Sequence, residues 1–212
     1  MLGAAGVCLA IFFATVAFVF EGSNVVTHVA AEFDRSISLS LAQFRENGGP
    51  TGRMTELSAV GSPAVVLIFA IVMSLEILKS RDWLAFAHLT TLLISASVLA
   101  RLLQFLWERA RPETLLPYLT VTKHSFPSAH MFGAAACYVT FAFLYARYSR
   151  GRATEIVVHA LAALLVIAIG FSRVYLGAHH TTDVVAGVAG GWAYGLLVAA
   201  IFSIWYPDHA RK

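Results

Sequence analysis

Residues 184–207 read VVAGVAGGWAYGLLVAAIFSIWYP and contain no charged side chain. A helix rises about 1.5 Å per residue, so about 20 apolar residues cross a hydrocarbon core that is about 30 Å thick. This stretch is therefore long enough to span a membrane as one helix. Five more windows have the same character: 1–20, 57–75, 83–100, 124–146 and 156–172. The sequence predicts an all-α integral membrane protein with six transmembrane helices.

The composition supports this interpretation. Hydrophobic residues make up 58% of the chain, charged residues only 13%, and the mean hydropathy is +0.73. Soluble chains carry about 25% charged residues, so the composition excludes a secreted soluble domain, a nucleic-acid-binding protein and a disordered chain. No internal repeat or linker-like segment interrupts the sequence, and residues 1–212 are expected to form a single domain.

Short basic segments indicate the orientation. Connections after the second and fourth windows, together with the C-terminus, carry Lys79, Arg81, Arg147, Arg150, Arg152, Arg211 and Lys212. Cytoplasmic loops of membrane proteins are enriched in lysine and arginine, so these segments are expected in the cytoplasm. Residues 21–56, by contrast, hold three arginines and five acidic residues. This first connection is therefore expected on the extracytoplasmic face.

An amphipathic helix is predicted within the first connection. Residues 29–44 mix charged side chains with apolar ones at intervals of three and four, namely Phe33, Ile37, Leu41 and Phe44. That spacing is typical of a helix with one apolar face, and the turn-forming residues 47–50 would end it. We expect the helix to lie along the outer membrane surface. Filling the interface beside the bundle is the favoured role, and gating substrate access is the alternative.

Three glycines mark a groove on the last predicted span. Gly187, Gly191 and Gly195 recur every four residues, so they share one helical face. Such a face lets another helix approach closely. We expect packing against a neighbouring span of the same chain. An oligomer seam through these glycines is the alternative and is not expected.

Two polar connections must lie on the same side of the membrane, because the chain crosses the membrane twice between them. The first contains residues 109–112 (RARP) and 123–130 (KHSFPSAH), and the second contains residues 172–183 (SRVYLGAHHTTD). We therefore expect their side chains to form one cluster.

Two arginines and a helix start in these stretches predict an anion site. Arg111 and Arg173 carry planar guanidinium groups that suit phosphate oxygens. Pro127 and Ser128 are typical of a helix N-terminus, with Ser128 as the N-cap. Free N–H groups and the positive end of the helix dipole would then face the same place, which favours a phosphate or a similar anion.

His179 and Asp183 predict a histidine nucleophile. They are four residues apart and would share one face if this stretch opens the last helix. A carboxylate that holds one imidazole nitrogen orients the ring and makes the other nitrogen more basic. His130 lies separately at the start of the fourth span, where it could protonate a leaving oxygen. His180 would point about 100° away from His179 and is left out of the set.

A divalent metal site is the alternative for the His-His-x-x-Asp pattern. Two converging arginines would repel a cation, and the cluster offers only one carboxylate. We therefore expect no metal and no other cofactor.

The three stretches resemble the signature of the type-2 phosphatidic acid phosphatase (PAP2) superfamily. That signature has a first motif ending in Arg-Pro, a second of Pro-Ser-Gly-His type, and a third of Ser-Arg, five residues, His, three residues and Asp. Here the motifs read Arg111-Pro112, Pro127-Ser128-Ala129-His130, and Ser172-Arg173 with His179 and Asp183. The resemblance covers residues 104–183, and six spans also suit the membrane branch of the superfamily.

The resemblance implies a metal-independent phosphatase. In such an enzyme His179 would become phosphorylated, Asp183 would orient it, and His130 would protonate the leaving group. The phosphoryl group would be held by Arg111, Arg173, Ser128 and the local backbone, which includes Ala129.

Two positions depart from the family pattern. Ala129 replaces a glycine, which is a mild change, and Gln104 stands where the family has lysine. Gln104 remains a candidate phosphate ligand, but an amide donates hydrogen bonds without supplying charge. Arg101, on nearly the same helical face, or Lys123, just before the second motif, is expected to restore the positive charge. Arg101 is favoured, and the alternative is that it only snorkels to the interface.

The sequence therefore predicts a lipid phosphate phosphatase of the cell (inner) membrane with its site on the extracytoplasmic face. Its partners would be the bilayer and a lipid phosphate such as phosphatidic acid, phosphatidylglycerol phosphate, a polyprenyl diphosphate or lipid A phosphate. A lipid phosphotransferase with the same nucleophile is the alternative among enzymes. A transporter or a catalytically silent scaffold is the alternative from another class, and the near absence of charges within the spans argues against transport.

Overall fold

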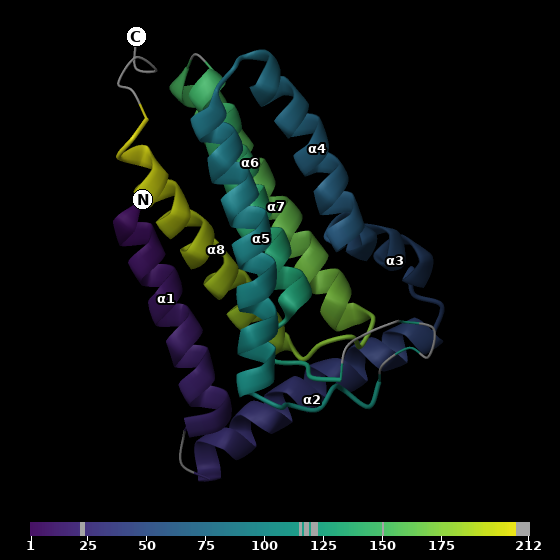
Figure 1. Cartoon of the computed structure of the whole chain (residues 1–212). Coiled ribbons are helices and arrows are strands. Elements are labelled where there is room, and N and C mark those ends of the chain that lie inside the picture. The colour runs from purple at the N-terminus through teal and green to yellow at the C-terminus, as the bar shows by residue number, and fades with distance from the viewer. Residues whose placement is uncertain (22–23, 115, 117–118, 120–122, 150, 207–212) are drawn as a thin grey trace.

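The computed structural model describes residues 1–21, 24–114, 116, 119, 123–149 and 151–206 (Figure 1). In these ranges the chain is helical throughout apart from its connections, as the sequence predicts. The elements are α1 (Leu2–Val16), η1 (Ala17–Glu21), α2 (Asn24–Glu46), α3 (Thr51–Val60), α4 (Pro63–Lys79), α5 (Trp83–Leu106), α6 (Ala129–Tyr148), α7 (Arg152–Tyr175) and α8 (Thr181–Ser203). Three basic residues used to predict the orientation, Arg150, Arg211 and Lys212, lie outside the described residues.

Five helices of the described chain are long and apolar enough to cross a membrane: Leu2–Phe20, α5, α6, α7 and α8. The predicted second span is not one straight helix, because α3 and α4 meet at an angle of 44°. Ser62 accepts a hydrogen bond from the Val65 N–H as the N-cap of α4, and Pro63 follows at the first helical position. Proline cannot donate the backbone bond that would continue α3. A sixth span therefore exists only if this bent pair crosses as one.

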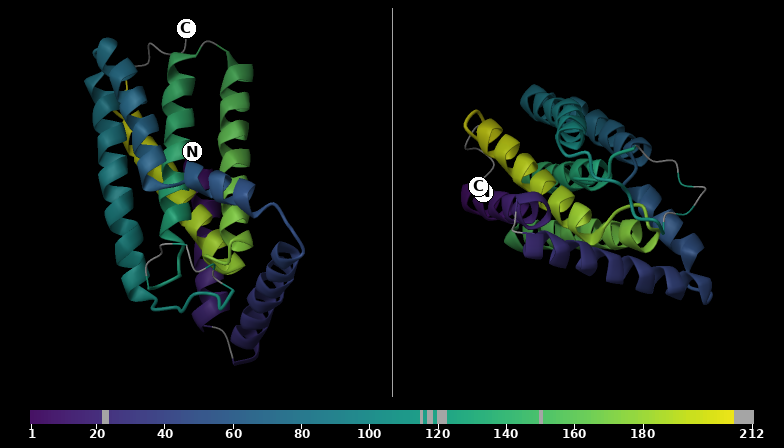
Figure 2. Two further views of the ribbon diagram at one scale, coloured as in Figure 1. Left: turned by 90° about the vertical axis from the view of Figure 1, so that its right-hand side faces the viewer. Right: turned by 90° about the horizontal axis from the view of Figure 1, so that it is seen from below.

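Helix α6 forms the centre of the bundle (Figure 2). Inside the protein 61% of the α6 window and 56% of the α8 window are buried, against 28% or less for Leu2–Phe20, α5 and α7. The expected packing of the glycine face is confirmed, because a Cβ atom added to Gly187 would lie 2.6 Å from the Ser128 carbonyl oxygen. A Cβ atom at Gly191 would overlap the Phe132 carbonyl group. The glycines are thus covered by α6.

The connections that carry the polar motifs lie at the same end of the bundle, as the number of spans predicts. Figure 1 shows the α5–α6 and α7–α8 connections at its lower end, where α2 crosses the bundle. The α4–α5 and α6–α7 connections lie at the opposite end.

Helix α2 confirms the helix predicted in the first connection, and the four apolar residues of its predicted stripe divide between the bundle and the outer side. Phe33 and Phe44 are exposed, whereas Ile37 and Leu41 are partly buried against the core. The fully covered positions are Ala30, Asp34 and Ser38. Small and polar residues therefore line the contact, while Phe33 turns outward and the Phe44 ring packs edge-on against Tyr175.

Replacement of Gly191 by alanine is expected to destabilise the fold by about 1–3 kcal/mol, because the added methyl group would overlap the α6 backbone. The melting temperature of the purified protein in detergent measures this effect. Gly6→Ala is the control, because nothing lies within 4 Å of a Cβ atom at that helical position. Equal melting temperatures for Gly191→Ala and wild type would contradict the close α6–α8 packing.

Candidate active site

His179 and Asp183 meet at the start of α8. The Nδ1 atom of His179 lies 3.6 Å from Oδ2 of Asp183, and His179 is only 2% exposed. The same carboxylate oxygen accepts the His180 N–H at 2.9 Å, so the first turn of α8 holds Asp183 in place. The expected pairing is present, although His179 stands just before the helix and not on its face.

Arg111 determines the tautomer of His179. Its Nη1 lies 3.2 Å from Nε2 of His179, and a guanidinium can only donate, so Nε2 accepts. The ring proton is then on Nδ1, toward Asp183. Burial lowers the pKa of His179 to about 4, while the neighbouring Asp183 acts in the opposite direction. The imidazole is therefore neutral near pH 7, with its Nε2 lone pair facing the arginine.

Two guanidinium groups lie beside this histidine. Arg111 also donates to the carbonyl oxygens of Ala178 and His124, and burial lowers its pKa. Arg173, in the last turn of α7, is 8% exposed and donates from Nη1 to Oγ of Ser58 at 3.0 Å. Its Nε has no partner, and no described carboxylate forms an ion pair with it. Buried positive charge without a matching acid is suited to an anion.

Helix α6 begins where the sequence predicts. Ser128 is its N-cap, and its Oγ accepts the Met131 N–H at 3.4 Å. The Ser128 N–H donates to the carbonyl oxygen of Asp183 at 3.0 Å, which ties the start of α6 to α8. Ala129 and His130 follow and line the cavity described next. The positive end of the α6 dipole thus faces the histidine and the arginines.

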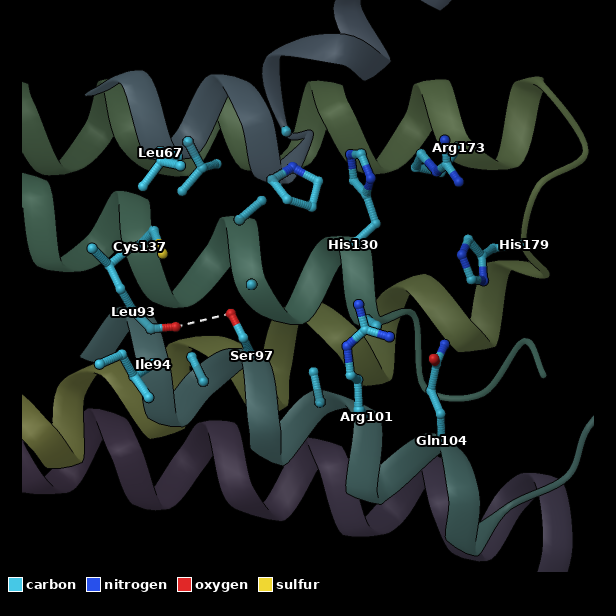
Figure 3. Close-up of a pocket in the computed structure, with 18 of the residues that line it drawn as sticks. Leu67, Leu93, Ile94, Ser97, Arg101, Gln104, His130, Cys137, Arg173 and His179 are labelled. Carbon is cyan, nitrogen blue, oxygen red and sulfur yellow. Dashed lines mark hydrogen bonds between the residues drawn. The ribbon is translucent and has the colours of Figure 1, made fainter. Parts of the chain in front are cut away.

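A cavity of about 600 Å³ opens from this cluster along the bundle (Figure 3). Its polar end contains Arg111, His130, Arg173 and His179. Its walls come from α4, α5 and α6 and are mostly apolar, including Val66, Leu67, Leu93, Ile94 and Cys137. The cavity suits a ligand with one anionic end and one apolar end. Among the described residues no group of three or more His, Cys, Asp or Glu side chains is arranged to hold a metal ion.

Comparison with known proteins identifies the family. The model of the PAP2 superfamily matches residues 84–207, which include all of α5, α6, α7 and α8. The chain belongs to the PAP2 superfamily. The match is independent of the cavity geometry, and it covers every motif on which the resemblance was based.

Two curated proteins and one solved structure are similar to this chain. A lipid A 1-phosphatase from Rhizobium etli is 34% identical over 132 residues, 58% of this chain and 52% of that protein. A phosphatidylglycerophosphatase B from Bacillus subtilis is 35% identical over 92 residues, 43% of each protein. The chain thus spans about half the length of these relatives. The crystal structure of a transmembrane PAP2 type phosphatidylglycerolphosphate phosphatase from Bacillus subtilis has a TM-score of 0.78 at 23% identity, covering 96% of this chain and 98% of that chain.

Of the three residues linked to the departure from the PAP2 pattern, Gln104 and Arg101 line the cavity and Lys123 does not. Gln104 is buried, and its amide nitrogen donates to the carbonyl oxygens of His124 (3.3 Å) and Pro127 (3.2 Å). Its two donors therefore support the loop before α6. Arg101 points from α5 into the cavity, whereas Lys123 is exposed and is not among the residues that line it (Figure 3).

Ser58 is a site residue that sequence reasoning missed. Its Oγ accepts a hydrogen bond from Arg173, and its carbonyl oxygen lies 3.1 Å from Nε2 of His130. It lies in the last turn of α3, just before the bend, and is 4% exposed. A single serine within the charge-free window 57–75 carries no sequence signal for these contacts. The bend between α3 and α4 was the feature that could have drawn attention to it.

Ser58→Ala is expected to weaken the binding of inorganic phosphate by at least about tenfold. Arg173 would lose a hydrogen bond that orients it, and bonds to charged groups contribute about 1.5–3 kcal/mol. Phosphate affinity in detergent can be measured by calorimetry. Tyr138→Phe is the matched control, because Tyr138 donates to the Val60 carbonyl oxygen at the same bend without contacting Arg173. Equal losses in both variants would contradict a specific role for Ser58.

Proposed function

We propose that this PAP2 chain is a lipid phosphate phosphatase that hydrolyses a phosphomonoester or diphosphate through a phospho-histidine intermediate. The observation that carries the proposal is the buried His179, with Asp183 behind it and two arginines beside it, at the polar end of a mostly apolar cavity. The curated relatives, a lipid A 1-phosphatase and a phosphatidylglycerophosphatase, support a lipid phosphate as the substrate.

The first step transfers the phosphoryl group to the enzyme. Arg111, Arg173 and the N-terminus of α6 bind the phosphoryl oxygens, and Nε2 of His179 attacks the phosphorus atom. The bond to the lipid oxygen breaks, and His130, which the anionic phosphoryl group would keep protonated, gives that oxygen its proton. Asp183 stabilises the positive charge that develops on the imidazole ring.

The second step releases phosphate. His130, now neutral, takes a proton from a water molecule, and the water oxygen attacks the phosphorus atom of the phospho-histidine. The P–N bond breaks, inorganic phosphate leaves, and His179 returns to its neutral form. No step requires a metal ion, so turnover in excess EDTA is part of the proposal.

The cavity supports a lipid bound from the side of the bundle. The phosphate would lie at the arginines, and the acyl or isoprenyl chain would follow the apolar walls of α4, α5 and α6 into the bilayer. Phosphatidic acid, phosphatidylglycerol phosphate, a polyprenyl diphosphate and lipid A phosphate all fit this description. A phosphotransferase would differ only in the acceptor, an alcohol or another phosphate in place of water.

We place the site on the extracytoplasmic face of the cell (inner) membrane. The end of the bundle opposite the site carries the basic residues Lys79, Arg81, Arg147 and Arg152 at its described connections. Cytoplasmic connections are enriched in such residues, which supports this orientation.

His179→Ala is expected to abolish phosphate release, because no other described histidine pairs with Asp183 in the same way. His180→Ala is the control and should keep much of the activity, since its ring does not contact the proposed nucleophile. The measurement is phosphate release by purified protein over the four lipid phosphates, with and without EDTA. Activity that survives without His179, or strict dependence on added magnesium, would overturn the mechanism.

Arg101 is proposed as the residue that supplies the charge missing at Gln104. Arg101 shares the cavity-lining face of α5 with Ser97 and Gln104, whereas Lys123 lies outside the cavity. A cation on an apolar span is costly to keep unless something compensates it, and a bound phosphate would do so.

Arg101→Ala is therefore expected to lower kcat/KM by at least about tenfold, equivalent to about 1.4 kcal/mol. Lys123→Ala is the matched control and should have little effect. Gln104→Lys should partly rescue the Arg101→Ala variant, because it returns a cation to the same helical face. Unchanged kcat/KM in folded Arg101→Ala protein would show that Arg101 only snorkels to the interface.

A further inference from the structure

Helix α2 buries one carboxylate against the active site. Asp34 is 0% exposed although the helix around it is largely exposed. Its Oδ1 accepts the Thr182 N–H at 3.0 Å, and its Oδ2 accepts Nη2 of Arg109 at 2.8 Å and the Thr182 hydroxyl at 2.5 Å. Asp34 thus contacts the first turn of α8, which also carries Asp183.

Arg109 lies between two carboxylates. Its Nη2 contacts Asp34, while its Nη1 donates to Oδ1 of Asp183 at 2.7 Å. The other oxygen of Asp183 is the one that faces Nδ1 of His179. A continuous series of contacts therefore leads from α2 through Arg109 and Asp183 to the nucleophile.

The charges along this series explain why two acids are present. Arg109 alone would neutralise Asp183 and weaken its support of the positive charge that develops on His179. With Asp34 included, the three groups carry a net charge of −1. A difference of one charge in this group has a large effect on His179, because the groups are buried and the effective dielectric constant is low.

We propose that Asp34 is a positioning residue, which holds Arg109 and balances its charge so that Asp183 remains an effective negative partner of His179. The proposal rests on the proposed function and assigns α2 a role in the chemistry beyond filling the membrane interface. Asp34 touches neither the cavity nor the nucleophile, so it acts only through Arg109 and the start of α8.

Other groups that face the nucleophile add positive or neutral character. They are Arg111 from the α5–α6 connection, Arg173 from α7 and His130 from α6. Asp34 and Asp183 supply the negative charge on the opposite side. The proton affinity of His179 should therefore respond to any change in the Asp34–Arg109 pair.

Charge-changing variants test the proposal in the full-length protein in detergent. Asp34→Asn leaves Arg109 to neutralise Asp183, so the pKa of His179 should fall and kcat should drop at least about tenfold, with little change in KM. Arg109→Gln removes the cation, so the pKa of His179 should rise. The double variant restores the charge balance, and the pKa should return close to the wild-type value.

The pKa of His179 is measured by NMR titration of isotopically labelled histidines, with its signal assigned from His179→Ala. Glu32→Gln and Arg35→Gln, which change the same charges at exposed positions of α2, are the controls and should leave the titration unchanged. Shifts in the same direction for Asp34→Asn and Arg109→Gln would overturn the proposal. So would an Asp34→Asn variant that loses only thermal stability while kcat and the His179 titration stay as in wild type.

The titration also separates the two proposals. A wild-type protein without phosphate release on any of the four lipids would contradict the proposed function. The opposite shifts in the single variants and their cancellation in the double variant would still report whether Asp34 balances Arg109.

Discussion

The site depends on the contacts of the buried Asp183 carboxylate. One oxygen accepts a hydrogen bond from Arg109, and the other accepts the His180 N–H and faces His179. Its own carbonyl oxygen accepts the Ser128 N–H, which joins the start of α6 to the start of α8. Burying a carboxylate is costly unless hydrogen bonds and opposite charge replace its water. The same contacts that compensate this cost bring the three motifs together.

Close packing of two helices makes that arrangement possible. Gly187 has no side chain where the Ser128 backbone approaches α8, so the N-terminus of α6 can reach Asp183. The bend between α3 and α4 completes the opposite wall, because it turns the Ser58 carbonyl oxygen toward His130 and its hydroxyl toward Arg173. The site is thus assembled from helix ends whose positions are determined by backbone contacts.

Much of this arrangement could be predicted from the sequence. Charge-free windows located the helices, counting spans brought the two polar connections to one end, and spacing paired His179 with Asp183. Other features could not be predicted, because in a membrane protein apolar side chains can face lipid as well as the core. The spacing of Phe33 and Phe44 therefore does not tell which side of α2 faces the bundle. Nothing in the sequence separates Asp34 from the other acidic residues of the first connection. Gln104 and Ser58 act through backbone carbonyl groups, which no side-chain pattern reveals.

The distribution of charge around His179 is what the proposed chemistry needs. Arg111 and Arg173 lie on the cavity side, whereas Asp183 and, through Arg109, Asp34 lie behind the ring. Before a substrate binds, the arginines and burial keep the imidazole unprotonated. A bound phosphoryl group would compensate the arginine charges, so the attraction between the acids and the positive charge on the ring would dominate as Nε2 forms its bond to phosphorus. The site would therefore favour positive charge on His179 only when a phosphoryl group is present to react.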